Sequence, residues 1–155
     1  MRSDIREETV PTPKTLTERA ALARFSRITK WFGWTVVLFF ALAFFGSSLR
    51  LPIPKFLDSL MQWGPGGAEQ YEQMISVINI VWGIYVLRAA EDPFSNVLFF
   101  DFTATGMVAH ITLMTLMGIF NAKDRVHLIG DILVGWAAIG PFTYVWIQTR
   151  QELGL

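Results

Sequence analysis

The sequence contains no cysteine and few charged residues. Among its 155 residues, 17% are Asp, Glu, Lys or Arg, against about 25% in soluble domains. The lack of cysteine excludes disulfide scaffolds, thiol nucleophiles and thiolate metal sites. Since 13 basic residues are balanced by 13 acidic ones, there is no excess positive charge for nucleic acid, and we expect no nucleic-acid partner.

Apolar residues are abundant instead: 52% of the chain is hydrophobic, and the mean hydropathy is +0.40. Charged residues are absent from four long stretches, over residues 31–49, 73–87, 102–122 and 132–149. A helix needs about 20 mainly apolar residues to cross the hydrocarbon core. We therefore predict four transmembrane helices, at about residues 31–49, 71–90, 96–120 and 126–146.

The apolar stretches have the features of helices in a membrane. They lack the alternation of a β-strand, and the run WTVVLFFALAFFG lacks the polar stripe of a helix in a soluble bundle. The predicted fold is all-α: a polytopic membrane protein whose residues 31–155 form an antiparallel bundle of four transmembrane helices.

The first 30 residues differ from the rest of the chain. Residues 1–15 are polar and we expect them to be disordered. Residues 16–30 place Ala21, Phe25 and Ile28 on one face and basic side chains on the other, which predicts a short amphipathic helix at the membrane surface. Alternatively, this segment is a basic flank that orients the first span.

The distribution of basic residues predicts the topology. Four spans place both termini on one side, with six basic residues against four on the other side. The first group is Arg19, Arg24, Arg27, Lys30, Arg88 and Arg150, and the second is Arg50, Lys55, Lys123 and Arg125. The excess favours cytoplasmic termini, in what we expect to be a bacterial plasma membrane.

Polar residues inside the predicted spans form two layers. Arg88 ends the second span and Asp101 lies near the start of the third, at a similar depth, so we predict a structural ion pair between them. Glu72, His110, His127 and Asp131 fall in the other half of the bundle. This second set fits a polar cluster that fixes helix register, a ligand or proton site, or a metal site.

Methionine offers a second metal hypothesis. Met107, His110, Met114 and Met117 share one face of the third predicted span. Thioether and imidazole ligands suit copper(I), although methionines at helical spacing also serve as packing residues. Apart from copper or another metal, the sequence predicts no cofactor.

Three features of the sequence carry a resemblance to a known family. The stretch YEQMISVINIVWGIYVLRAAEDP (residues 71–93), the His110-x-x-x-Met114 spacing and the later RVHLIGD resemble a family of small bacterial integral-membrane proteins of unknown function. Their layout is similar to that of DoxX-like membrane proteins. The resemblance implies a four-helix membrane unit with Glu72, Arg88, His110 and Asp131 as its polar positions.

Three functional hypotheses follow. The first is a membrane protein that binds an apolar ligand, a lipid or quinone, between its helices. The second is an accessory or scaffold subunit of a larger membrane complex or homo-oligomer. The third is a proton-coupled or metal-dependent enzyme or transporter that uses the polar cluster. The sequence favours a protein without catalytic chemistry whose partners include membrane lipids.

Overall fold

The computed structural model describes residues 15–49 and 69–155, and all its long elements are helices. They are α1 (Leu16–Ser48), α3 (Glu69–Ala89), α4 (Val97–Phe120) and α5 (Asp131–Leu153). Short 3-10 helices precede α4 (Phe94–Asn96) and α5 (Arg125–Ile129). The all-α class is confirmed over this part of the chain. Residues 1–14 of the predicted tail, and residues 50–68, lie outside it.

Local sequence sets the ends of the outer helices. Thr15 and Glu18 form a reciprocal capping box at the start of α1, with hydrogen bonds of 3.1 and 3.2 Å. Gly154 ends α5 in a left-handed conformation (φ 68°), which allows the amide of Leu155 to reach the carbonyl oxygen of Arg150 at 3.0 Å.

The structure corrects two predicted boundaries. Residues 16–30 do not form a separate helix but the first turns of a continuous α1, and Ala21 and Phe25 are buried inside the protein. The last long helix does not cover residues 126–146. It begins later, at Asp131, because a 3-10 helix and Gly130 precede it, and it continues to Leu153.

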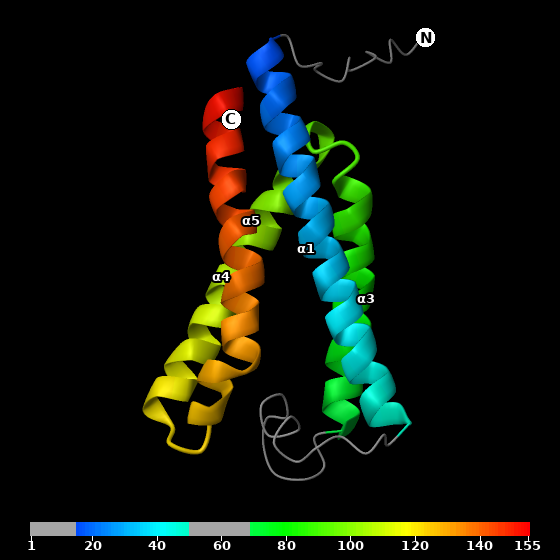
Figure 1. The fold of residues 1–155 in the computed structure, drawn as a ribbon, viewed down its shortest axis with the longest axis vertical. Helices are drawn as coiled ribbons and strands as arrows, with labels where there is room; N and C mark the ends of the chain where they lie inside the picture. The colour runs from blue at the N-terminus through cyan, green and yellow to red at the C-terminus, as the bar shows by residue number, and fades with distance from the viewer. Residues whose placement is uncertain (1–14, 50–68) are drawn as a thin grey trace, which may run out of the picture.

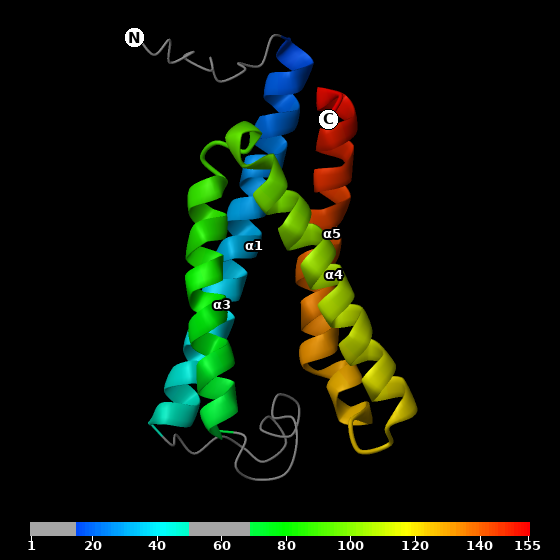
Figure 2. The ribbon, with the colours of Figure 1, turned by 180° about the vertical axis from the view of Figure 1, so that it is seen from behind.

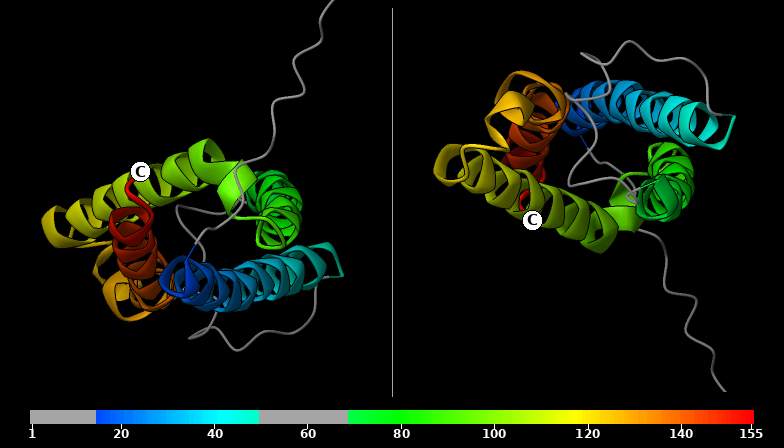
Figure 3. Two further views of the ribbon diagram at one scale, coloured as in Figure 1. Left: turned by 90° about the horizontal axis from the view of Figure 1, so that it is seen from above. Right: turned by 90° about the horizontal axis from the view of Figure 1, so that it is seen from below.

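The four long helices run up and down, and both ends of the described chain lie at the same end of the molecule (Figures 1 and 2). We call it the terminal end. There Arg24 of α1 binds Glu152 of α5, with Nη2 and Oε1 2.9 Å apart. α1 packs against both α3 and α5, and α4 packs against α5 (Figure 3). The pair α1–α3 and the pair α4–α5 diverge toward the opposite end.

Aromatic side chains form the core near the terminal end. The rings of Phe25, Phe100 and Trp146 come from three helices and have centroids 4.6–5.4 Å apart. Phe142 stacks on Phe32 at 4.7 Å. All five side chains are buried, so this cluster joins α1, α4 and α5 by a large apolar contact.

The outer surface is also apolar, as a membrane requires. Large hydrophobic residues such as Leu42 (74% exposed), Ile78 (67%) and Phe102 (66%) face outward. Within the described residues, three helical segments are long and apolar enough to cross a membrane: Leu16–Ser48, Phe94–Phe120 and Asp131–Leu153. α3 is not among them, since its first turns carry Glu69, Gln70, Glu72 and Gln73.

Candidate functional site

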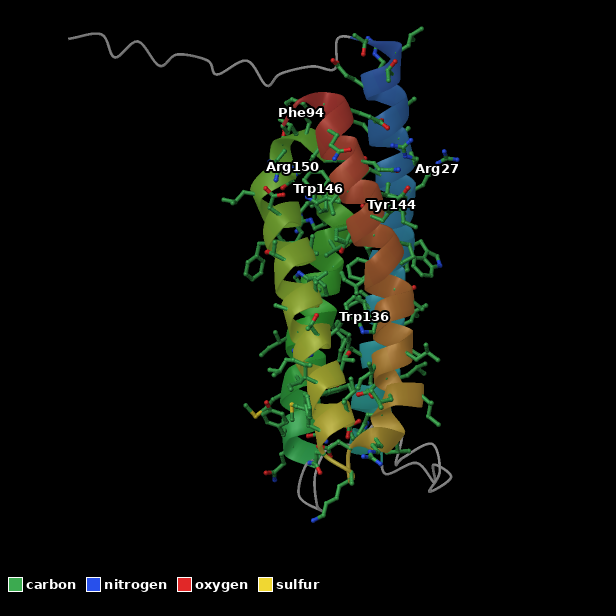
Figure 4. The ribbon with its side chains drawn as sticks, turned by 90° about the vertical axis from the view of Figure 1, so that its left-hand side faces the viewer. Arg27, Phe94, Trp136, Tyr144, Trp146 and Arg150 are labelled. Carbon is green, nitrogen blue, oxygen red and sulfur yellow. The ribbon has the colours of Figure 1, made fainter. Side chains whose placement is uncertain are left out.

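Asp101 lies at the centre of a polar cluster between α4 and α5. Its carboxylate accepts hydrogen bonds from Arg150 Nη1, at 2.8 and 2.9 Å, and from the indole nitrogen of Trp146 at 2.9 Å. Arg150 and Trp146 extend from α5 toward α4 near the terminal end (Figure 4). The predicted ion pair between Arg88 and Asp101 is therefore wrong. α4 packs on α5, and the carboxylate meets the arginine of that neighbour.

Sequence reasoning missed Arg150 and Trp146 as functional neighbours of Asp101. The prediction ended the last span at residue 146 and so left Arg150 outside the bundle. A signal was present, because Trp146 and Arg150 are four residues apart and so share one helical face. Both also lie at the end of the molecule where Asp101 begins the predicted third span.

Arg88 lies instead at an open surface of α3. Its side chain is exposed at the end of α3, with the guanidinium carbon 5.9 Å from the centre of the Tyr85 ring. Among the described residues it forms no ion pair. Asp92, in the turn that follows, is engaged by Ser95, whose hydroxyl donates to its carboxylate at 2.6 Å.

Two adjoining hollows lie at the start of α4, and the smaller one lies between the end of α3 and the start of α4, beside Arg88. The smaller, of about 310 Å³, is lined by Arg88 and Tyr85 of α3 together with Asn96 and Phe99. The larger, of about 550 Å³, shares Asn96 and Phe99 and adds the Phe102 side chain. We call this region the Arg88 groove. It is open, three of its eight lining residues are aromatic, and it has one cationic group.

A second polar pair lies at the opposite end of the molecule. His127 is buried, and its Nδ1 lies 3.2 Å from Oδ1 of Asp131. The same carboxylate oxygen accepts a hydrogen bond from the amide of Ile132 at 3.0 Å. The pair therefore joins the 3-10 helix before α5 to the first turn of α5.

The other residues of the predicted polar cluster do not join this pair into a metal site. Within residues 15–49 and 69–155, no three His, Asp or Glu side chains are grouped so that they could hold a metal ion. Glu72 lies on α3, which packs against α1, whereas His127 and Asp131 contact α4 and α5. His110 has an exposed side chain in the middle of α4.

The methionines of the copper hypothesis have different surroundings. Met107 and Met114 pack against the hydrophobic core, while Met117 is 43% exposed. Core packing explains the first two without a metal.

Comparison with known proteins agrees with the resemblance seen in the sequence. A family of unknown function, DUF6632, matches residues 34–140, which is more than half of the chain. No curated protein and no solved structure matches the chain. The matched region includes Arg88, His110, His127 and Asp131, whereas Trp146 and Arg150 lie beyond it. The chain therefore belongs to this family of unknown function.

Proposed function

We propose that the chain is a four-span protein of a bacterial plasma membrane, in which α3 is the fourth span and both termini are cytoplasmic. α3 lies along α1 (Figures 1 and 2), so a membrane around α1 also surrounds α3. The outer face of α3 is apolar: Met74, Ile78 and Tyr85 are 64%, 67% and 56% exposed. Such a layout of four helices is similar to that of DoxX-like proteins.

We propose further that the protein binds an amphiphile with an anionic head group, of the phospholipid class, in the Arg88 groove. The observation that carries this proposal is the position of Arg88, which is exposed, has no carboxylate partner among the described residues and lines a groove. Arg24 and Arg150 are instead neutralised by Glu152 and Asp101 within the protein. Arg19 and Arg27 of α1 are also exposed, but neither lines this groove.

The lining of the groove favours a lipid over a polar metabolite. Tyr85, Phe99 and Phe102 offer aromatic surface to an acyl chain. Arg88 and Asn96 offer hydrogen-bond donors near the ends of the helices, where lipid head groups lie. Arginine also suits phosphate, because its planar guanidinium can donate two parallel hydrogen bonds.

This proposed ligand site differs from the one predicted from the sequence, which consisted of Glu72, His110 and Asp131. A proton-coupled or metal-dependent site has less support, because His127 and Asp131 are the two members of that cluster that come together.

The test compares lipid retention by Arg88→Gln and Arg125→Gln. Arg125 is an exposed arginine at the opposite end, so its variant removes the same charge. Native mass spectrometry would measure the binding of phosphatidylglycerol and phosphatidylcholine to the purified protein. We expect Arg88→Gln to weaken phosphatidylglycerol binding about tenfold and Arg125→Gln to leave it unchanged. Equal retention by both variants, or equal binding of the two lipids, would contradict the proposal.

A further inference from the structure

His110 is a polar side chain near the middle of a membrane-spanning helix, where a surface that contacts only lipid is expected to be apolar. It lies ~20 Å along the axis from Val97 and ~15 Å from Phe120, at 1.5 Å per residue, which is the middle of a span. Its side chain is exposed, and it makes no hydrogen bond or ion pair with the described residues. His127, in contrast, is buried and paired with Asp131.

Several other polar side chains on the helices satisfy their hydrogen bonds locally, although the buried hydroxyl groups of Thr29, Thr103 and Thr149 have no partner among the described residues. The hydroxyl groups of Thr35, Thr105 and Thr115 donate to the carbonyl oxygen four residues earlier, at 3.0, 2.7 and 2.7 Å. Asn79 does the same at 2.9 Å. His110 has no such bond. Since an unsatisfied polar group in hydrocarbon costs several kcal/mol, a partner from outside this chain is strongly favoured.

The surface around His110 is shaped for another helix. Gly106, His110, Leu113 and Met117 follow one another at spacings of four, three and four, as in the seam of a coiled coil. We call these four residues the His110 face. Leu113 and Met117 are 58% and 43% exposed. No atom lies within 4 Å of the position that a Cβ on Gly106 would occupy, so a second backbone can approach closely there.

We propose that the His110 face binds the same face of a second copy of this chain, to form a dimer in the membrane. A neutral imidazole has one donor and one acceptor nitrogen, so one His110 donates a hydrogen bond to the other across a two-fold axis. A lipid acyl chain has no group that can accept or donate this bond. Because the donor nitrogen of one imidazole complements the acceptor nitrogen of the other, a second copy is favoured over an unrelated partner. This proposal is independent of the Arg88 groove.

Disulfide crosslinking tests this contact directly, because the chain has no cysteine of its own. Leu113→Cys places a thiol on the His110 face. Leu38→Cys is the matched control, since Leu38 is on α1 and both leucines are 58% exposed. Under oxidation in native membranes, we expect Leu113→Cys to form a disulfide-linked dimer at least about fivefold more efficiently than Leu38→Cys.

A second substitution in the Leu113→Cys variant tests whether crosslinking depends on the His110 hydrogen bond or only on the closeness of the two helices. His110→Ala should lower crosslinking about five- to tenfold, and His110→Gln should retain most of it, because the carboxamide keeps a donor and an acceptor. Gly106→Leu should also lower it by blocking close approach, while leaving the fold intact because the space beside Gly106 is open.

Three results would overturn the dimer. The first is equal crosslinking of Leu113→Cys and Leu38→Cys. The second is an undiminished yield of crosslinked dimer in both the His110→Ala and the Gly106→Leu variants. The third is a crosslinked species with the mass of a complex with a different protein. Size-exclusion chromatography with light scattering gives a second readout, in which the unmodified protein should have the mass of two chains and Gly106→Leu the mass of one.

Discussion

Asp101 of α4 accepts two hydrogen bonds from a single nitrogen of Arg150 of α5, at 2.8 and 2.9 Å. The indole of Trp146, one turn earlier on α5, donates a third at 2.9 Å. Both charged side chains are about one-third exposed, at 31% for Asp101 and 37% for Arg150. The cluster therefore joins the two helices at the terminal end, beside the buried aromatic core.

We expect Asp101→Asn and Arg150→Gln each to lower the free energy of unfolding by about 1 kcal/mol, since the pair is charged but partly solvated. The two changes should be coupled, because each removes the same interaction. Thermal unfolding in detergent, followed by circular dichroism, gives the four stabilities of the double-mutant cycle.

Arg88→Gln is the control for this cycle. Arg88 is the partner that depth alone suggests for Asp101, yet the structure places it beside Tyr85. Its variant should show no coupling to Asp101→Asn. A coupling energy with Arg88 as large as that with Arg150 would contradict the observed pairing.

Close packing of α1 on α3 depends on Gly83. A Cβ at this position would lie 2.8 Å from Val37 Cγ2 and 3.3 Å from the carbonyl oxygen of Gly33. Gly83→Leu should therefore separate the helices and lower the free energy of unfolding by about 1–3 kcal/mol. The matched change is Gly140→Leu, because no atom lies within 4 Å of the Cβ position there. Equal losses in the two variants, measured by unfolding in SDS, would refute a special role for Gly83.

The number of spans can be tested with single cysteines in exposed positions. With four spans, Thr17→Cys and Glu91→Cys lie on one side of the membrane and Lys123→Cys on the other. If α3 does not cross, Thr17→Cys and Glu91→Cys lie on opposite sides. With cytoplasmic termini, a membrane-impermeant maleimide should label Lys123→Cys in intact cells and the other two after permeabilisation. Labelling of Glu91→Cys but not Thr17→Cys in intact cells would exclude the span by α3.

The sequence predicts the bounds of the helices better than it predicts which helices pack against each other. The predicted helices over residues 71–90 and 96–120 agree closely with α3 and α4, because an apolar run and flanking polar or proline residues mark their ends. Residues 16–30 show the limit of such reasoning. The apolar face predicted for them is present, but the pattern does not reveal whether lipid or another helix contacts that face. In the structure, Phe25 packs on Phe142 and Trp146 of α5 rather than on lipid.

The prediction of the polar cluster shows a similar limit. His127 and Asp131 are close in sequence, so their spacing predicts that they meet, and they do. Glu72 and His110 were added by depth alone. Depth along a span says nothing about the direction in which a side chain leaves the helix, and His110 is exposed rather than joined to the pair.

Composition and local pattern by themselves determined that the described part of the chain is helical with long apolar segments, and where α3 and α4 begin and end. These properties depend on hydrophobicity and on capping within a few residues. The tertiary structure alone decided which arginine Asp101 binds. Arg88 and Arg150 both lie at the terminal end, but the order in which the helices pack places Asp101 of α4 beside Arg150 of α5. That order depends on contacts among distant segments, above all the aromatic core that joins α1, α4 and α5.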